Sequence, residues 1–291
     1  MTSTRLLTVP ASHREKPSRE PSSAWLTALM IVAGITFCIP ILGILMTSFR
    51  SEASIANEGL WAFSTAFSFE NYTTLWTETG MWRYMLNSFL IAVPATIIST
   101  FLGVLAGYSL TKFAPRGSKW ITLFLVSGLF IPPQILLLPL FRAFSSVGLY
   151  DTLWPMIIVH SGYGVALCTL MMKNFFASVP DEIREAGLID GASEPRVLLH
   201  LVLPITKPAL AALATLQFTF IWNDFLYPLV FTRSDDVKTV MVGLLALQGP
   251  YTTAYGIQAA VAICASIPTI LIFFFFQKQF TAGLTSGAVK G

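Results

Sequence analysis

Long apolar stretches without Asp, Glu, Lys or Arg recur along this chain, separated by shorter polar segments. Crossing the hydrocarbon core of a bilayer takes a helix of about 20 mostly apolar residues. Six stretches reach that length and predict spans at about 25–49, 87–111, 120–141, 152–172, 208–231 and 254–277. The fifth carries one charge, Asp224. Six such stretches in 291 residues indicate an all-α, polytopic membrane protein.

The composition agrees with this prediction. Hydrophobic residues make up 54% of the chain and charged residues 11%, whereas soluble domains carry roughly 25% charged residues. The basic residues lie at the ends of apolar stretches and form no patch, so nothing indicates nucleic-acid binding. Three cysteines, Cys38, Cys168 and Cys264, lie inside apolar stretches. We interpret them as buried hydrophobes, not as metal ligands or disulfides.

The distribution of basic residues predicts the orientation. Thirteen Lys and Arg residues lie in the N-terminal tail, the second and fourth loops and the C-terminal tail, and five lie in the other loops. Loops rich in Lys and Arg stay in the cytoplasm, so both termini are expected there. The chain is then organised as a tail at 1–22, a transmembrane domain at 23–280 and a second tail at 281–291.

The fourth loop, 173–207, is richer in charge than the apolar stretches beside it. Ser178 is placed to cap a helix whose first turn contains Asp181, and Gly191 is placed to end that helix. A second segment follows at 194–202, and Pro204 is expected to close it.

The predicted loop helix places small residues on one face. Ile183, Ala186 and Gly187 are spaced at i, i+3 and i+4, and charged residues flank them. Because Ala and Gly are small, another surface can approach the backbone closely here. Spacing and charge alone leave two interpretations open: a solvated amphipathic helix, or a peg that fits a cleft in a cytoplasmic partner.

The same residues resemble the signature loop of ABC importer permeases. That family's pattern is Glu-Ala-Ala-x3-Gly-x9-Ile-x-Leu-Pro, and the spacing here matches from Glu185 to Pro204. Gly187 replaces the second Ala and Leu201 replaces Ile. The resemblance implies an ATPase-coupling loop made by Glu185, Ala186, Gly187, Asp190, Gly191, Leu203 and Pro204.

Further segments are similar to the carbohydrate branch of these permeases. They are residues 131–135, 139–141, 148–151, 189–193 and 222–228, and the tail at 283–291 resembles that of maltose-type second permeases. The resemblance implies a six-helix permease of the type I (MetI-like) importer fold in a bacterial inner membrane. It also implies separate ATPase subunits, a sister permease, an extracytoplasmic solute-binding protein and a contact between Lys290 and the ATPase.

The chain lacks the Gly-x4-Gly-Lys-Ser/Thr phosphate loop. ATP hydrolysis is therefore expected on partner subunits, and this chain is expected to be neither an enzyme nor a cofactor protein. Polar and aromatic residues at membrane depth are candidates for a solute path: Gln134, Trp222, Asn223, Asp224 and Tyr227. For each of them an interhelical hydrogen bond is the alternative.

Other classes of function fit these residues less well than a sugar importer does. A membrane-embedded metal hydrolase would need clustered ligands, but His13, His160 and His200 lie far apart in the sequence. An ion-coupled carrier would need paired carboxylates in its spans, where only Asp224 lies. An importer of polyols or glycerol phosphoesters stays open. A phosphorylated solute would favour Arg or Lys in the path, and the predicted spans contain neither.

Overall fold

The structure is a computed structural model that describes residues 24–62, 67–247 and 254–288, with side chains up to 279. All regular elements in these ranges are helices. The predicted tail at 1–22 and Lys290 lie outside them. The chain divides into two compact units, residues 1–43 and 44–291. The first unit contains most of α1 (Ala24–Ser48), a helix without any charged residue.

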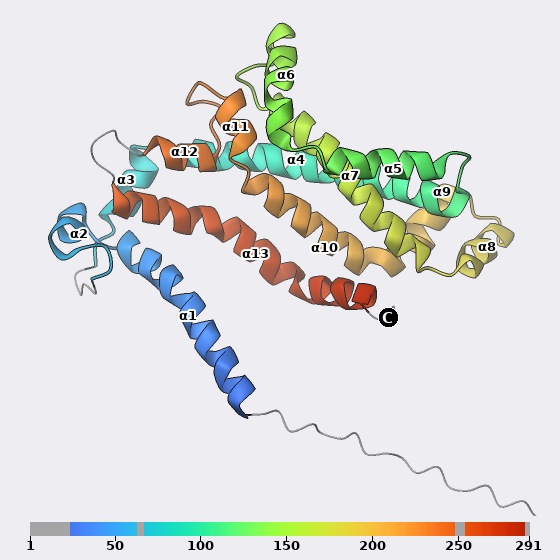
Figure 1. Cartoon of the computed structure of the whole chain (residues 1–291), viewed down its shortest axis with the longest axis horizontal. Coiled ribbons are helices and arrows are strands. Elements are labelled where there is room, and N and C mark those ends of the chain that lie inside the picture. Colours follow the sequence, from blue (N-terminus) through green and yellow to red (C-terminus); the bar gives the residue numbers. More distant parts are fainter. Residues whose placement is uncertain (1–23, 63–66, 248–253, 289–291) are drawn as a thin grey trace, which may run out of the picture. The chain divides into compact units, whose positions relative to one another are not determined.

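Four long helices form the second unit: α4 (Met81–Tyr108), α7 (Trp154–Ala177), α10 (Leu203–Trp222) and α13 (Tyr255–Ala288). In Figure 1, α4 packs along α7, and α10 lies against both α4 and α13. Their main apolar cluster contains Leu75, Met81, Ile91, Met156, Phe218, Trp222, Phe231 and Val261, among others. Helix α13 continues past residue 277, so residues up to 288 that were predicted as a tail are helical.

The shorter elements connect these helices. They are α2 (Glu52–Glu58), α3 (Glu70–Thr77), the π-helical turn η1 (Ser109–Phe113), α5 (Ser118–Leu129), α6 (Pro133–Ser146), α8 (Asp181–Ile189), α9 (Glu194–Val197), the π-helical turn η2 (Leu198–Val202), α11 (Leu226–Phe231) and α12 (Val240–Ala246). In the described residues, five helical segments are long and apolar enough to cross a membrane, or six if the pair α5 and α6 counts as one bent span.

The third predicted span, 120–141, is not straight. Helices α5 and α6 meet at 93°, with the break at Phe130–Pro132. Two consecutive prolines cause this break, because neither has an N–H to donate and each disfavours helical backbone in the residue before it. Figure 1 shows α6 directed away from the long helices.

The fifth predicted span, 208–231, also differs. Its helix α10 begins earlier and ends at Trp222, and α11 forms a separate short helix after the break at 223–225. The side chain of Asp224 stabilises this break, since its Oδ1 accepts a hydrogen bond from the N–H of Leu226 at 3.1 Å. A capping carboxylate at a helix N-terminus satisfies donors that the short helix leaves free.

Glycines set the distance between α4 and α7. A Cβ atom added at Gly103 would lie 2.3 Å from the Cβ of Cys168, and one added at Gly107 would lie 2.9 Å from the backbone N of Lys173. Both helices therefore approach to backbone contact, as small residues allow in membrane bundles. This tight pair carries the loop that follows α7.

Candidate functional site: the loop between α7 and α10

The loop begins with a turn that ends α7 and starts α8. Ser178 does not cap α8 as predicted, because its hydroxyl donates to the carbonyl O of Phe175 at the end of α7. Pro180 holds the N-cap position instead. Pro180 fixes its own φ, and Asp181 and Glu182 place negative charge in the first turn of α8.

Gly191 ends α8, as its position in the sequence predicted. The helix stops at Ile189, and Gly191 adopts φ +82°, a left-handed backbone that favours glycine. The N–H of Gly191 donates to the carbonyl O of Leu188, and the N–H of Ala192 donates to that of Gly187, both at 3.0 Å. These bonds satisfy free carbonyls at the helix end. Asp190 precedes the turn and is exposed.

One face of α8 packs on the chain itself. Gly187 is buried, and a Cβ added there would lie 2.6 Å from Cδ1 of Leu201 and 3.2 Å from Cγ2 of Val197. Ile183 packs against the same apolar cluster. Gly187 therefore admits the close approach that the sequence predicted, but the surface that approaches is the helix η2 of this chain.

The other side of α8 is exposed, and it includes Ala186, which was predicted to share a face with Ile183 and Gly187. Glu182, Glu185, Ala186 and Ile189 lie at i, i+3, i+4 and i+7, so they form one stripe, which we call the outer face of α8. The side chain of Ile189 is 85% exposed. Ile189 was not among the predicted site residues, although its spacing of four residues from Glu185 places both on one helix face. Two carboxylates around an apolar tip suit a complementary, basic-rimmed cleft.

The second segment of the loop does not end at Pro204. Helices α9, η2 and α10 continue without a break as one 29-residue segment, Glu194–Trp222. The wider turn of η2 precedes the proline, with the N–H of Leu203 donating to the carbonyl O of Leu198. Pro204 follows directly as the second residue of α10, so the widened turn lies next to the position where the N–H is missing. Leu203 packs on the neighbouring apolar cluster, and Pro204 is exposed.

The candidate solute-path residues fall into separate environments. Trp222 is 1% exposed, and its Nε1 donates to the carbonyl O of Ala265, so it holds α10 to α13. Tyr227 is also buried. Asn223 is exposed at the end of α10, and its amide donates to the carbonyl O of Thr219. Gln134 lies on the exposed first turn of α6 and takes part in none of these contacts.

The structure brings Asp224 and His160 together. Their Oδ2 and Nε2 atoms are 3.1 Å apart, and both side chains are mostly buried. The ring of His160 also lies edge-on to that of Tyr227, with 5.5 Å between centroids. This pair was not predicted, because its two residues are 64 positions apart in the sequence. This group joins α7 to the break between α10 and α11.

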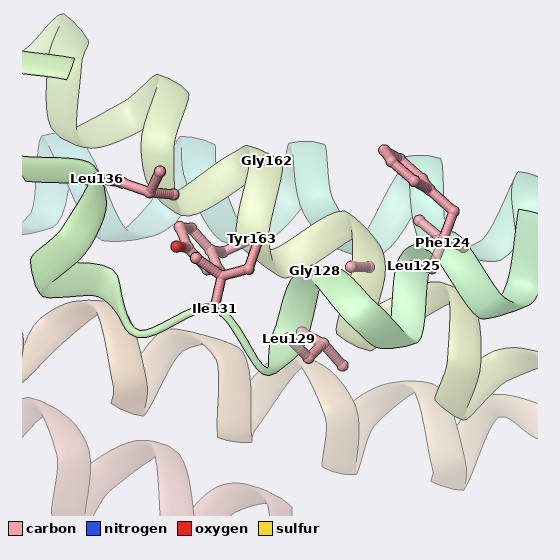
Figure 2. Close-up of a pocket in the computed structure, with 9 residues that line it drawn as sticks. Phe124, Leu125, Gly128, Leu129, Ile131, Leu136, Gly162 and Tyr163 are labelled. Carbon is pink, nitrogen blue, oxygen red and sulfur yellow. The ribbon is translucent and has the colours of Figure 1, made fainter. Parts of the chain in front are cut away.

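A groove of about 250 Å³ lies between α5, the break before α6, and α7. Figure 2 shows Leu129, Ile131, Leu136 and Tyr163 around it, and apolar side chains supply almost all of its lining. Sugars carry many hydroxyl groups that need polar partners. The groove is therefore unsuited to a sugar. Its apolar wall is of the kind on which another apolar surface packs.

Residues 99–286 match the family model described as the binding-protein-dependent transport system inner membrane component. The chain belongs to this family. It is thus a multi-pass inner-membrane permease component, and the matched range includes the whole loop between α7 and α10.

Relatives and solved structures extend the likeness over most of the permease. It is 31% identical over 281 residues to the arabinooligosaccharides transport system permease protein AraQ of Halalkalibacterium halodurans, covering 95% of this chain and 100% of the relative. It is 30% identical to the osmoprotective compounds uptake permease protein GgtD of Synechocystis, covering 90% of each chain. A bacterial ABC transporter that imports the acidic polysaccharide alginate has a chain of the same fold, with a TM-score of 0.77 and 21% identity over 88% of this chain and 95% of that one.

Proposed function

We propose that this permease is the transmembrane subunit of an ATP-driven importer for neutral sugars, in particular oligosaccharides. Membership of a binding-protein-dependent transport family supports the importer. The similarity to a permease named for arabinooligosaccharides, over nearly the whole of both chains, supports the sugar. The expected partners are two ATPase subunits, a sister permease and an extracytoplasmic solute-binding protein.

The outer face of α8 is the proposed contact with an ATPase subunit, and it is the observation that carries the proposal. Glu185 and Ala186 lie in the middle of this face with Ile189 at its end, all exposed, while Gly187 on the opposite face fixes the helix to η2. Gly191 and Asp190 then end the helix, and Leu203 and Pro204 begin the span that receives its movement. The basic loops would place this contact, both termini and Lys290 in the cytoplasm.

The proposed solute path passes the break between α10 and α11. The exposed amide of Asn223 is available to sugar hydroxyls there. The carboxylate of Asp224 accepts from the N–H of Leu226 and meets His160, so it would hold the path wall next to Asn223. Trp222 and Tyr227 are buried and would shape the wall behind them. Gln134 would contribute from α6 when the helices rearrange during transport.

The test uses the complex purified from its own cells through a tag on this permease and reconstituted into liposomes. Charge reversal by Glu185→Lys should remove the ATPase subunits or abolish sugar-stimulated ATP hydrolysis. Glu78→Lys, an exposed carboxylate at the end of α3, is the matched control and should retain both. Uptake of labelled arabinotriose should exceed uptake of glycerol 3-phosphate.

Two results would contradict the proposal. If Glu185→Lys binds the ATPase and transports normally, α8 is not the coupling element. If the native complex takes up glycerol 3-phosphate but no neutral oligosaccharide, the importer class stands and the solute class is wrong.

A further inference from the structure

We propose that a clamp on the inner side of α8 makes α8 and the end of α4 move as one body, so that ATPase movement enters the membrane domain through α4 as well as through α10. The clamp consists of Lys112, Asp181, Tyr108, Arg184 and Glu194. This inference rests on the proposed coupling role of α8, and it assigns positioning residues that the signature loop does not contain.

The first half of the clamp joins η1 to the start of α8. The side chain of Lys112 is 3% exposed, and its Nζ donates to the carbonyl O of Val179 and to Oδ1 of Asp181, both at 2.7 Å. This hydrogen bond from Lys112 holds the pKa of the Asp181 carboxyl below its usual value. A mostly buried ammonium that lost these two acceptors would be left unpaired, so the contact is costly to break.

The second half joins α4, α8 and α9 at one carboxylate. Oε2 of Glu194 accepts from the hydroxyl of Tyr108 at 2.9 Å and from Nε of Arg184 at 3.2 Å, and its Oε1 pairs with Nη2 of Arg184. A guanidinium that meets both carboxylate oxygens fixes direction as well as distance. The hydrogen bond to Glu194 raises the pKa of Arg184.

Aromatic packing holds the second half in place. Tyr108 is 4% exposed, and its ring lies edge-on to Phe113 and to Phe176, with centroids 5.9 and 5.6 Å away. The guanidinium carbon of Arg184 lies 5.3 Å from the ring centre of Phe113. These contacts restrain the ring of Tyr108, whose hydroxyl donates to Glu194 in the loop.

The division of charges over α8 argues for transmission. Asp181 and Arg184 face the clamp, whereas Glu182 and Glu185 belong to the outer face, where nothing in the described residues pairs with their carboxylates. A nine-residue helix is too short to be stable alone, so its orientation depends on such contacts. Without the clamp, a push on the outer face would turn α8 about Gly187 instead of moving α4.

Spin labels test the one-body claim in the native complex. The labelled sites are Pro180, the exposed N-cap residue of α8 that lies outside its outer face, and Arg116, which is also exposed. The background is Cys38→Ser, because Cys38 is the exposed one of the three cysteines. The distance between the labels should be the same, with an equally narrow distribution, in the nucleotide-free and ATP-bound states. A distance that changes with nucleotide during normal transport would overturn the clamp.

Variants test its consequence. Lys112→Met and Glu194→Gln should keep the ATPase subunits bound and ATP hydrolysis active, while sugar transported per ATP falls about fivefold or more, the lower end of usual coupling between sites. Tyr108→Phe removes a single hydroxyl, so it provides the same test if Lys112→Met or Glu194→Gln impairs folding. Lys238→Met breaks another Lys–Asp pair, with Asp235, and should leave the ratio unchanged.

The outcomes separate the two proposals. If Glu185→Lys abolishes ATPase binding but Lys112→Met, Glu194→Gln and Tyr108→Phe all transport the native amount of sugar per ATP, the clamp is refuted and the coupling role of α8 stands. If Glu185→Lys leaves ATPase binding and transport intact, the proposed function of the loop fails first.

Discussion

The contact between α4 and α7 permits a quantitative prediction. A methyl group added by Gly103→Ala would lie 2.3 Å from the Cβ of Cys168 and 2.9 Å from its carbonyl carbon. Non-bonded carbon atoms lie about 3.5–4.0 Å apart. The helices must therefore separate by about 1 Å, since backbone and a Cβ atom offer no flexible end that can turn away.

Gly162→Ala is the matched control on α7. A Cβ at Gly162 meets nothing within 4 Å, and the position is exposed beside the groove of Figure 2. Both substitutions gain about 1 kcal/mol from the higher helix propensity of alanine. Their difference isolates the cost of overpacking, about 1–3 kcal/mol. Gly103→Ala should thus unfold about 2 kcal/mol more easily than Gly162→Ala.

The assay is unfolding of the purified permease in mixed micelles by added dodecyl sulfate, followed by tryptophan fluorescence. The double variant Gly103→Ala/Cys168→Gly removes the opposing Cβ, so it should lose less stability than the two single changes added together, by about 0.5–3 kcal/mol. Equal stability of Gly103→Ala and Gly162→Ala would refute the argument from close approach.

Three further predictions concern other parts of the chain. Ile189→Asp should reduce copurification of the ATPase without changing the thermal stability of the permease, because the side chain is 85% exposed; an equal fall in stability would mean a packing role. Arg50→Met should speed hydrogen exchange across 52–62, since the 2% exposed guanidinium donates to the carbonyls of Ser54, Gly59 and Ala62; unchanged exchange there would show that α2 holds without it. Burial raises the pKa of Asp151, but the N–H groups of Arg233 and Ser234 lower it more, so its folded pKa lies below the usual value. The stabilisation by Asp151 is then present above about pH 4 and lost as the pH falls through the folded pKa. The melting temperatures of the native chain and Asp151→Asn should therefore differ at about pH 7 and converge in acid. A difference that stays constant with pH would contradict this.

The long helices were predictable because each one pairs an apolar run with flanking charge. The regions of α4, α7 and α13 were all predicted this way. A helix in the membrane is apolar whether it faces lipid or other helices, so its sequence can be recognised without knowing its contacts. The prolines were less informative. Pro132 and Pro133 interrupt the helix where a straight span was predicted at 120–141. Pro204 lies inside a continuous helical segment, although the segment was predicted to end there.

What separates these cases is tertiary context. At Pro204 the turn of η2 widens and neighbouring helices hold the segment, whereas the pair at 132–133 removes two donors in succession. The loop was predictable where a local rule decides, as at Gly191. The contact partners of Gly187 and Tyr108 were not predictable, because they lie on other helices.

The unbroken helix from Glu194 to Trp222 has a mechanical consequence. At 1.5 Å per residue its 29 residues extend for about 43 Å, close to the full thickness of a bilayer with its headgroups. The turn of η2 and Pro208 are the places where this segment can bend, because widened turns and prolines are the usual sites of helix kinks. Its last residue, Trp222, adjoins the break at which Asp224 meets His160. The loop and the His160–Asp224 pair therefore lie at the two ends of one continuous run of helix.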